Sequence, residues 1–293
     1  MNYSVVLPGG IAGLFLTLAV CVSSCQDATE IVVQDLQMEI PADSRTFSET
    51  VLPGEIADTR IEHLAYAGPA SPVIDLEAGH VTMFIFLAGT GVLHADTFVR
   101  HLTPESIAIP MDDIGSVRLE VPAGEELHFL QFTKKLTDED NEDLASFPAD
   151  NKYSLYFTRF VDTEPYTEKI KSPNTVSRTV LPADIIPRVS LGTVEAPGPD
   201  RVGAHEHPML DQLFLGLTDN DIVVHADNAS AELGEFSVLH IPIGSSHSVT
   251  VGENKKMYYL WMDFFLNREG QEWLKTHKPV STDETAVQDK DPT

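Results

Sequence analysis

Cysteine and basic residues are scarce in this 293-residue chain, and each shortage excludes a class of function. Its two cysteines, Cys21 and Cys25, both stand near the start of the sequence. A domain that begins after them has no thiol for a disulfide or for cysteine chemistry. Lys and Arg number 19 against 45 Asp and Glu, giving a formal net charge of -26 without a concentrated basic patch. Such a chain repels polyphosphates, so we expect no nucleic-acid partner and interpret the acidity as a well-solvated surface.

Long hydrophobic runs are also scarce, and the exception, "IAGLFLTLAVCV" from Ile11, has the length of a leader h-region. No Lys or Arg precedes Arg45, so the usual cationic start of a leader is missing. The following "VSSCQD" resembles a bacterial lipobox, in which Cys25 after the small Ser24 fits the lipidated position. We therefore predict a lipid on Cys25 that anchors the protein to a membrane of the cell envelope. An ordinary hydrophobic leader is the alternative.

The remainder of the chain contains an internal repeat. "TVLPGEI" from Thr50 returns as "TVLPADI" from Thr179, and each copy is followed by an apolar run and later by Ile-Pro. The shared order of features indicates a duplicated unit. The predicted segments are a leader or signal peptide (1–25), a flexible tether (26–44), an N-terminal domain (45–150), a C-terminal domain (151–278) and a disordered tail (279–293).

Short β-branched and aromatic runs dominate both units. Examples are "SVRLEV" and "FSVLHIPI", which are bounded by Gly, Pro, Asp and Asn. This pattern predicts an all-β fold of antiparallel sheets. Helical pattern is confined to residues 137–147 and 267–277, at the end of each unit.

Histidines are clustered in the second unit. His205 and His207 flank one residue, and the two-residue period of a strand directs both to one face. His247 follows later in "IPIGSSHSV". Three imidazoles in this arrangement predict a metal site.

These motifs resemble the cupin superfamily, whose first motif is His-x-His, four residues and Glu, and whose second is Pro-x-Gly-x-x-His. Here the first motif reads His205-Glu-His207, "PMLD" and Gln212, and the second runs from Pro242 to His247. With the repeat, the resemblance implies a bicupin of two double-stranded β-helix barrels. It also implies that His205, His207, Gln212 and His247 hold one divalent ion per chain. Mn²⁺, Fe²⁺, Zn²⁺ and Ni²⁺ are all acceptable to such ligands.

The first unit departs from the family pattern. Gly79-His80 stands where the His-x-His is expected, Thr82 takes the carboxylate position, and no histidine follows Pro110 closely. We therefore predict a metal-free, degenerate N-terminal barrel that is structural or builds a homodimer. We expect the remaining histidines to be surface or hydrogen-bonded core residues: His63, His94, His101, His128, His225 and His240.

Gln212 shapes the expected chemistry, because an amide leaves the charge of the ion uncompensated. Such a site is a strong Lewis acid and attracts an anion. The first hypothesis is an enzyme that isomerises, eliminates from or hydrolyses a uronate, keto acid or hydroxy acid. Asp263 and Glu195 are the candidate bases. Tyr259 and Trp261 share the strand face of Asp263, although core packing explains these aromatic residues more simply.

Two other functions are compatible with the same pattern. One is an Fe²⁺ cupin dioxygenase, and the other is a non-catalytic lipoprotein that binds a sugar acid. Strand parity also predicts that Asp211, beside Gln212, points outward.

Overall fold

The computed structural model describes residues 30–111 and 114–276. The predicted leader, Cys25 and the predicted tail lie outside the described residues. Within those two ranges, no helix is both long and apolar enough to cross a membrane.

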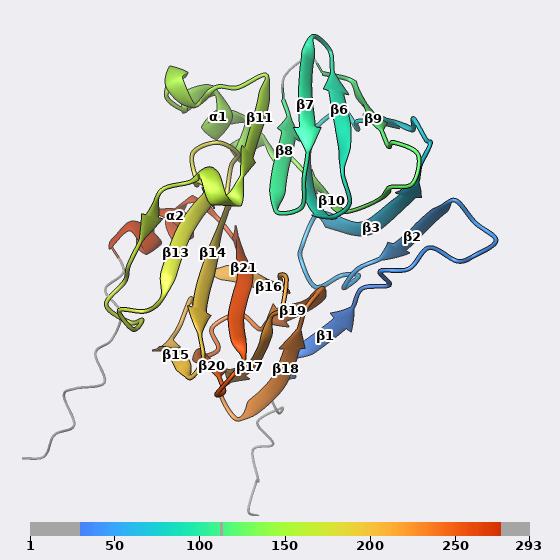
Figure 1. Ribbon diagram of the computed structural model, residues 1–293. Coiled ribbons are helices and arrows are strands. Elements are labelled where there is room, and N and C mark those ends of the chain that lie inside the picture. Colours follow the sequence, from blue (N-terminus) through green and yellow to red (C-terminus); the bar gives the residue numbers. More distant parts are fainter. Residues whose placement is uncertain (1–29, 112–113, 277–293) are drawn as a thin grey trace, which may run out of the picture.

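In the described part of the N-terminal half, a six-stranded sheet faces a four-stranded sheet, both antiparallel (Figure 1). The larger sheet has the order β11-β8-β5-β10-β3-β2 and the smaller one β4-β9-β6-β7. The bounds are β2 (Thr46–Thr50), β3 (Thr59–Ala67), β4 (Val73–Asp75), β5 (His80–Ala88), β6 (Gly91–Ala95), β7 (Phe98–Leu102), β8 (Ser106–Pro110), β9 (Ser116–Glu120), β10 (Glu126–Lys135) and β11 (Leu155–Arg159).

The C-terminal half repeats this order over its described residues. Its larger sheet reads β1-β19-β16-β21-β14-β13-β12 and its smaller sheet β15-β20-β17-β18. The bounds are β1 (Val32–Asp35), β12 (Pro165–Tyr166), β13 (Val176–Leu181), β14 (Val189–Pro197), β15 (Asp200–His205), β16 (Leu210–Gly216), β17 (Asp221–Ala226), β18 (Ala229–Gly234), β19 (Ser237–Ile241), β20 (His247–Val251) and β21 (Lys256–Phe265). The prediction of an all-β fold of two double-stranded β-helix barrels is confirmed.

The halves exchange edge strands, which corrects two predicted boundaries. β1 lies ahead of the N-terminal barrel in sequence but pairs with β19 of the C-terminal barrel. β11 lies beyond the predicted boundary at residue 150 but pairs with β8 of the N-terminal barrel. The prediction of a tether is therefore wrong for Val32–Asp35, and the N-terminal unit extends through β11. Backbone groups at a sheet edge take any available strand as partner, which sequence position alone does not reveal.

A shared core holds the barrels together. The outward faces of the two large sheets pack on each other, so that Ile85 and Leu130 belong to the same buried cluster as Leu213 and Met262. Each barrel has a second, separate cluster in its interior. Central strands of the large sheets are therefore buried on both faces, as the unbroken burial of Leu210–Gly216 shows, whereas edge strands such as β2 remain partly exposed.

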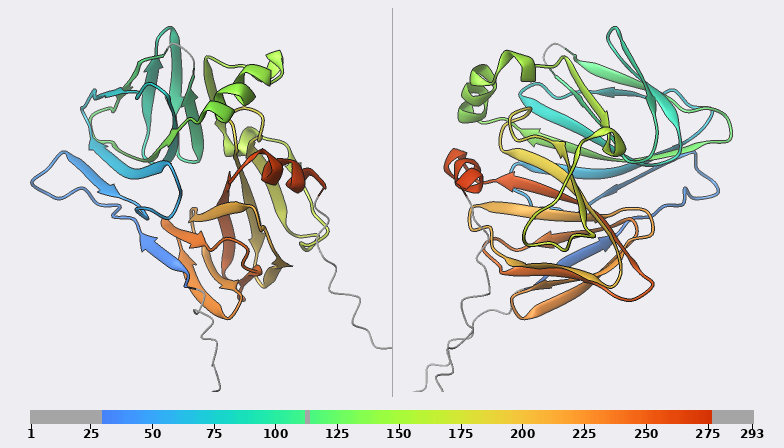
Figure 2. Two further views of the ribbon diagram at one scale, coloured as in Figure 1. Left: turned by 180° about the vertical axis from the view of Figure 1, so that it is seen from behind. Right: turned by 60° about the vertical axis from the view of Figure 1, so that its left-hand side comes forward.

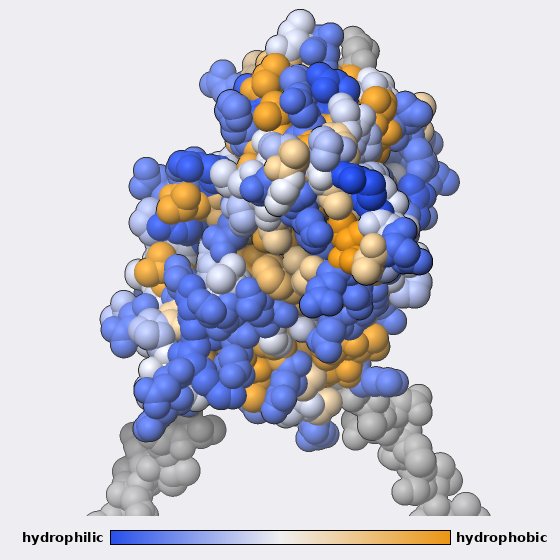
Figure 3. Space-filling view, turned by 45° about the vertical axis from the view of Figure 1, so that its right-hand side comes forward, coloured by the Kyte–Doolittle hydropathy of each residue, from blue (hydrophilic) through white to orange (hydrophobic). Residues whose placement is uncertain are grey.

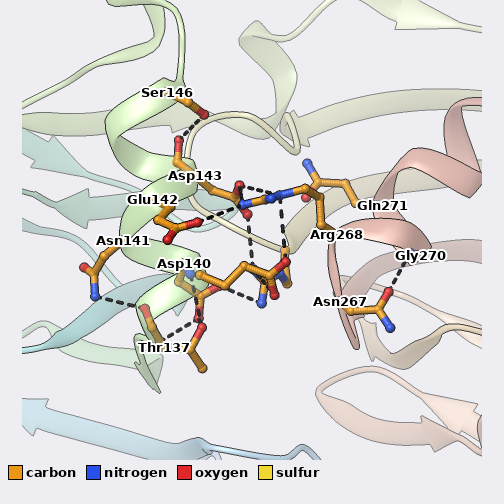
Figure 4. A network of polar contacts seen from close by, with 12 residues as sticks. Thr137, Asp140, Asn141, Glu142, Asp143, Ser146, Asn267, Arg268, Gly270 and Gln271 are labelled. Carbon is orange, nitrogen blue, oxygen red and sulfur yellow. Dashed lines mark hydrogen bonds and ion pairs between the residues drawn. The ribbon is translucent and has the colours of Figure 1, made fainter.

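The two α-helices that the structure describes lie close together on one side of the molecule (Figure 2). They are α1 (Asp138–Ser146) and α2 (Arg268–Thr276), and both confirm the predicted helical segments. Asp143 of α1 accepts hydrogen bonds from Arg188 at 3.1 Å and from Arg268 of α2 at 2.8 Å (Figure 4). Ion pairs thus add to the apolar contact between the halves.

The surface has the composition that the acidic sequence predicts. Figure 3 shows one side of the molecule, on which hydrophilic residues cover most of the area and hydrophobic residues form separate patches, one of them near the centre. A mostly hydrophilic face agrees with the prediction of a well-solvated surface.

Candidate metal centre

The structure brings His205, His207 and His247 together. His205 ends β15, His247 begins β20, and the two residues are register partners. His207 follows in the turn before β16 rather than within the strand. The ring centroids lie 4.3 Å apart for His205 and His247 and 4.9 Å apart for His205 and His207. One nitrogen of each ring lies within 4.8 Å of the others. Since two imidazole nitrogens on one ion are at most about 4.2 Å apart, small ring movements suffice to bind it.

Hydrogen bonds fix which nitrogen atoms face the cluster. His205 donates from Nδ1 to the carbonyl oxygen of Gly203 at 2.8 Å, and Nδ1 of His247 lies 3.3 Å from that of Ser245. These contacts leave Nε2 of both rings as the unprotonated, metal-binding atom. Burial and the neighbouring imidazoles lower the pKa of His247 well below its usual value, which keeps the ring neutral. Its buried Nε2 has no hydrogen-bond partner.

Gln212 completes the candidate ligand set from the large sheet. Its side chain lines the same cavity as His205 and His207. The amide nitrogen donates to Oδ1 of Asp263 at 2.6 Å, while the buried amide oxygen has no hydrogen-bond partner. An orphaned oxygen costs free energy unless something binds it. The residues present therefore fit a divalent ion held by three imidazoles and one amide oxygen.

Asp263 lies in the cavity, as its assignment as a base requires. It is buried on β21, and this burial is the main cause that raises its pKa to about 7, with the hydrogen bond from Gln212 opposing the shift. Tyr259 and Trp261 line the same cavity. The predicted common face of these three residues is thus observed, and it faces the site.

Glu195, the other predicted base, lies elsewhere. Val194 lines the cavity, whereas Glu195 faces the other side of β14 and pairs with Lys256 at 3.1 Å. The strand alternation removes Glu195 from the site. The parity prediction for Asp211 is confirmed. Asp211 does point away from the cavity, but that face is covered, and Asp211 is buried against His240 at 3.2 Å.

The cavity has a volume of about 460 Å³ and contains charged residues that the sequence motifs did not indicate. Glu168 and Lys171 lie on the segment between β12 and β13, ahead of the histidine motifs in sequence. Lys171 is almost buried, with 6% of its side chain exposed, and its Nζ lies 2.6 Å from Oε2 of Glu168. From the sequence, only the scarcity of lysine in this acidic chain points weakly to Lys171 as a site residue, because no motif surrounds it.

The remaining histidines mostly confirm the prediction of hydrogen-bonded core or surface residues. His63 contacts Glu49 and His128 at 3.0 and 3.2 Å, and both histidines are buried. His240 lies between Glu55, at 2.7 Å, and Asp211. Contacts with polar side chains also hold His94 and His225, and His101 is exposed.

Each barrel has one glycine that packs closely against backbone, and these two glycines show which positions of the barrels are equivalent. A Cβ at Gly68 would lie 1.7 Å from the carbonyl oxygen of Pro122, and one at Gly198 would lie 1.9 Å from that of Gly252. Pro122 and Gly252 are therefore equivalent, and Val117 precedes Pro122 by the same number of residues as His247 precedes Gly252.

By this correspondence, the N-terminal barrel has apolar residues at two ligand positions. Its register pair Ile74 and Val117 replaces His205 and His247. Thr82 pairs with Thr133 as Gln212 pairs with Asp263, which confirms the predicted equivalence of Thr82 and Gln212.

The predicted position of His80 is wrong. His80 begins β5 and pairs with Lys135, so its counterpart is Leu210, which pairs with Phe265. His80 therefore does not replace a histidine of the cluster. That the N-terminal barrel binds no metal stays a prediction.

Solved structures share this architecture at low sequence identity. A protein from Pseudomonas aeruginosa described as glyoxylate-induced matches with a TM-score of 0.63 and 12% identity, over 83% of this chain and 93% of its own. A cupin 2 conserved barrel domain protein from Leptotrichia buccalis gives 0.53 and 11%, over 78% and 92%. Oxalate decarboxylase from Lactobacillus farciminis, in a formate complex, gives 0.53 and 13%, over 86% and 89%. No family model matches the sequence, and no curated protein does.

The fold is therefore that of the cupins, present twice in one chain as in a bicupin. At these identities the likeness shows the fold, and the function has to be argued from the site.

Proposed function

We propose that the protein is a divalent-metal-dependent enzyme that acts on a small organic anion by non-redox Lewis-acid chemistry. The observation that carries the proposal is the convergence of His205, His207 and His247 at a cavity where the amide oxygen of Gln212 is buried without a partner. A bound ion would supply a Lewis acid that polarises a substrate oxygen. The formate complex of the structurally similar oxalate decarboxylase gives further support for a small carboxylate.

The side chains of the cavity have separate roles in this proposal. Asp263 is the candidate base, because its carboxyl group lies inside the cavity and is oriented by Gln212. Phe214 packs on Tyr259 with ring centroids 4.6 Å apart, and together with Trp261 these rings exclude water from the reacting groups. Isomerisation, elimination and hydrolysis all use such a base beside a polarised carbonyl.

Metal analysis tests the ligand assignment directly. We expect about one divalent ion per chain in the purified domain and much less in His207→Ala and His247→Ala variants, because each removes one neutral ligand. His225→Ala is the matched control. His225 lies in the same small sheet but contacts Ser230 and Thr250 instead of the cluster. Equal metal content in all four proteins would show that the three histidines do not form the site.

A substrate panel then separates the reaction classes. Anaerobic turnover of a uronate, keto acid or hydroxy acid by the metal-loaded protein is the expected result. Oxygen consumption by the iron form with a catechol, thiol or diketone would instead identify a dioxygenase. Thermal stabilisation by a sugar acid, without any product in mass spectrometry, would identify a binding protein.

Anchoring through Cys25 is a further part of the proposal, and the lipobox-like "VSSCQD" alone supports it. Metabolic labelling with a fatty-acid analogue in a bacterial host should mark the full chain and not a Cys25→Ala variant. Labelling of both, or of neither, would contradict lipidation at this residue.

A further inference from the structure

The segment between β12 and β13 covers one side of the cavity, and backbone contacts fasten it to the histidine cluster. We call residues 167–171 the entry segment. The amide of Gly203 donates to the carbonyl oxygen of Ile170 at 3.0 Å, and Lys171 forms a β-bridge with Val202. The carbonyl oxygen of the same Gly203 accepts the hydrogen bond from Nδ1 of His205. Gly203 therefore links the entry segment to His205, a candidate metal ligand, through two hydrogen bonds.

Lys171 is the charged residue that this arrangement places inside the cavity. Its Nζ donates to Oγ of Ser177 at 2.8 Å and pairs with Glu168 at 2.6 Å. Burial of an ammonium group is costly, and burial is also the main cause that lowers the pKa of Lys171. Its partner Glu168 is more open, with 37% of the side chain exposed, so another anion can replace it. A buried lysine paired with a partly exposed glutamate adds little to stability. An anion-binding site, in contrast, needs a buried cation whose ion-pair partner can be displaced.

The charges of the cavity restrict which anion fits. Two lysines line it, Lys171 within and Lys169 exposed to solvent, and they face the carboxyl groups of Glu168 and Asp263. A phosphate dianion would meet repulsion from both acidic groups. A single carboxylate needs one cation, which Lys171 provides as a hydrogen-bond donor of fixed position.

We propose that Lys171 binds the carboxylate of the substrate, with Glu168 giving up its place as the ion-pair partner, and that the site thereby selects small monocarboxylates. This inference rests on the proposed function, since it concerns the same cavity. Lys171 determines specificity in this scheme and takes no part in proton transfer.

Calorimetric titration of the manganese-loaded chain with matched acids and amides tests the role of Lys171. The probes are lactate, pyruvate and glucuronate, each compared with its neutral amide, together with inorganic phosphate. Because a charged hydrogen bond is lost, Lys171→Met should weaken binding of the preferred acid by about tenfold or more and leave its amide within about twofold. Lys171→Arg should keep part of the preference. Glu168→Gln should tighten binding of the acid, because it removes the competing carboxylate.

Lys169→Met is the matched control, because it removes a lysine from the rim of the same cavity and should change binding of the acid little. Thermal unfolding of each variant shows whether it is folded. The proposal is wrong if the wild-type chain prefers none of the three acids to its amide, if it prefers phosphate, or if Lys171→Met and Lys169→Met behave alike.

The same titrations on metal-free protein separate this inference from the proposed function. If the wild-type chain binds no metal but still prefers the acid to its amide, and Lys171→Met loses this preference, the anion site is supported and the metal enzyme is rejected. Normal metal content in Lys171→Met with an unchanged preference would reject the role of Lys171 alone.

Discussion

The two barrels have the same strand order and differ in what fills them. In the N-terminal barrel Phe84, Phe86 and Phe129 pack together, with centroids of 5.7 to 5.8 Å from Phe129 to the other two. In the N-terminal barrel Phe86 is the register partner of Phe129, and in the C-terminal barrel Gly216 is the register partner of Tyr259. The C-terminal barrel therefore has a glycine where the N-terminal barrel has the ring of Phe86.

This barrel also contains the three histidines and the cavity of about 460 Å³ beside them, whereas the cavity of about 550 Å³ beside the N-terminal barrel lies between the start of β5 and α1. A duplicated fold thus allows one copy to supply stability while the other gives up packing for a site. The following variants test that division.

The largest expected effect is on catalysis. Asp263→Asn keeps an oxygen that can accept from Gln212 but cannot take a proton at neutral pH. We expect kcat on the substrate found in the panel to fall by about 10²- to 10⁴-fold, with normal metal content. Thr133→Ala, at the corresponding place in the N-terminal barrel, should leave kcat unchanged. A fully active Asp263→Asn enzyme would reject this carboxylate as the base.

The second-largest expected effect is a difference between the barrels in the stability that is lost when a large core side chain is removed. Phe129 is fully buried among aromatic rings, so Phe129→Ala should lower the free energy of unfolding by about 3–5 kcal/mol in urea titrations. Trp261 already borders a cavity, and Trp261→Ala should cost about 2 kcal/mol or less, because the site needs less repacking. Similar losses in both variants would contradict the view that the N-terminal barrel is the more tightly packed one.

The buried histidine pair of the N-terminal barrel, His63 and His128, should make the stability of the protein depend on acidic pH. Burial, with the neighbouring His63, lowers the pKa of His128 to about 4 from an ordinary 6.5. The unfolded chain therefore binds the proton more readily, and this contribution is present above about pH 6.5 and is lost as the pH falls toward 4. Because solvent screens part of the interaction, the contribution is smaller than the roughly 3 kcal/mol of the full shift.

His128→Leu should flatten this part of the stability profile. Urea midpoints measured from pH 7.5 to 4.5 provide the comparison with the wild-type chain, which cancels the acid sensitivity of other groups. A variant whose midpoint falls in parallel with that of the wild type would show that His128 is protonated equally in both states.

The smallest effect concerns the contact between the halves. Arg268→Ala removes the ion pair with Asp143, but nearly half of the arginine side chain is exposed, so the urea midpoint should fall only slightly and less in high salt. Arg159→Ala is the control, because Arg159 is similarly exposed and pairs with Asp162 within its own half. A fall larger than that of Leu130→Ala, which truncates the shared apolar core, would mean that ion pairs dominate the interface.

Local pattern predicted the β-strands, and the resemblance of the histidine motifs to those of cupins implied the two barrels and the ligand set. Alternating apolar residues and turn residues predict strands, because each strand buries one or both of its faces. The spacing of His205, His207 and His247 identifies the cluster. Parity also places Tyr259, Trp261 and Asp263 on one face of β21, and the structure shows that this face lines the cavity.

Long-range pairing decided the remainder. Parity gives the face of Glu195 or Asp211 relative to its own strand, but only packing decides which face meets the cavity, the solvent or the other barrel. β1 joins the C-terminal sheet from the far end of the sequence, and the entry segment brings Lys171 to the site without any motif. Sequence periodicity reports burial along a single strand, whereas a site is formed by side chains whose proximity depends on how separate strands dock.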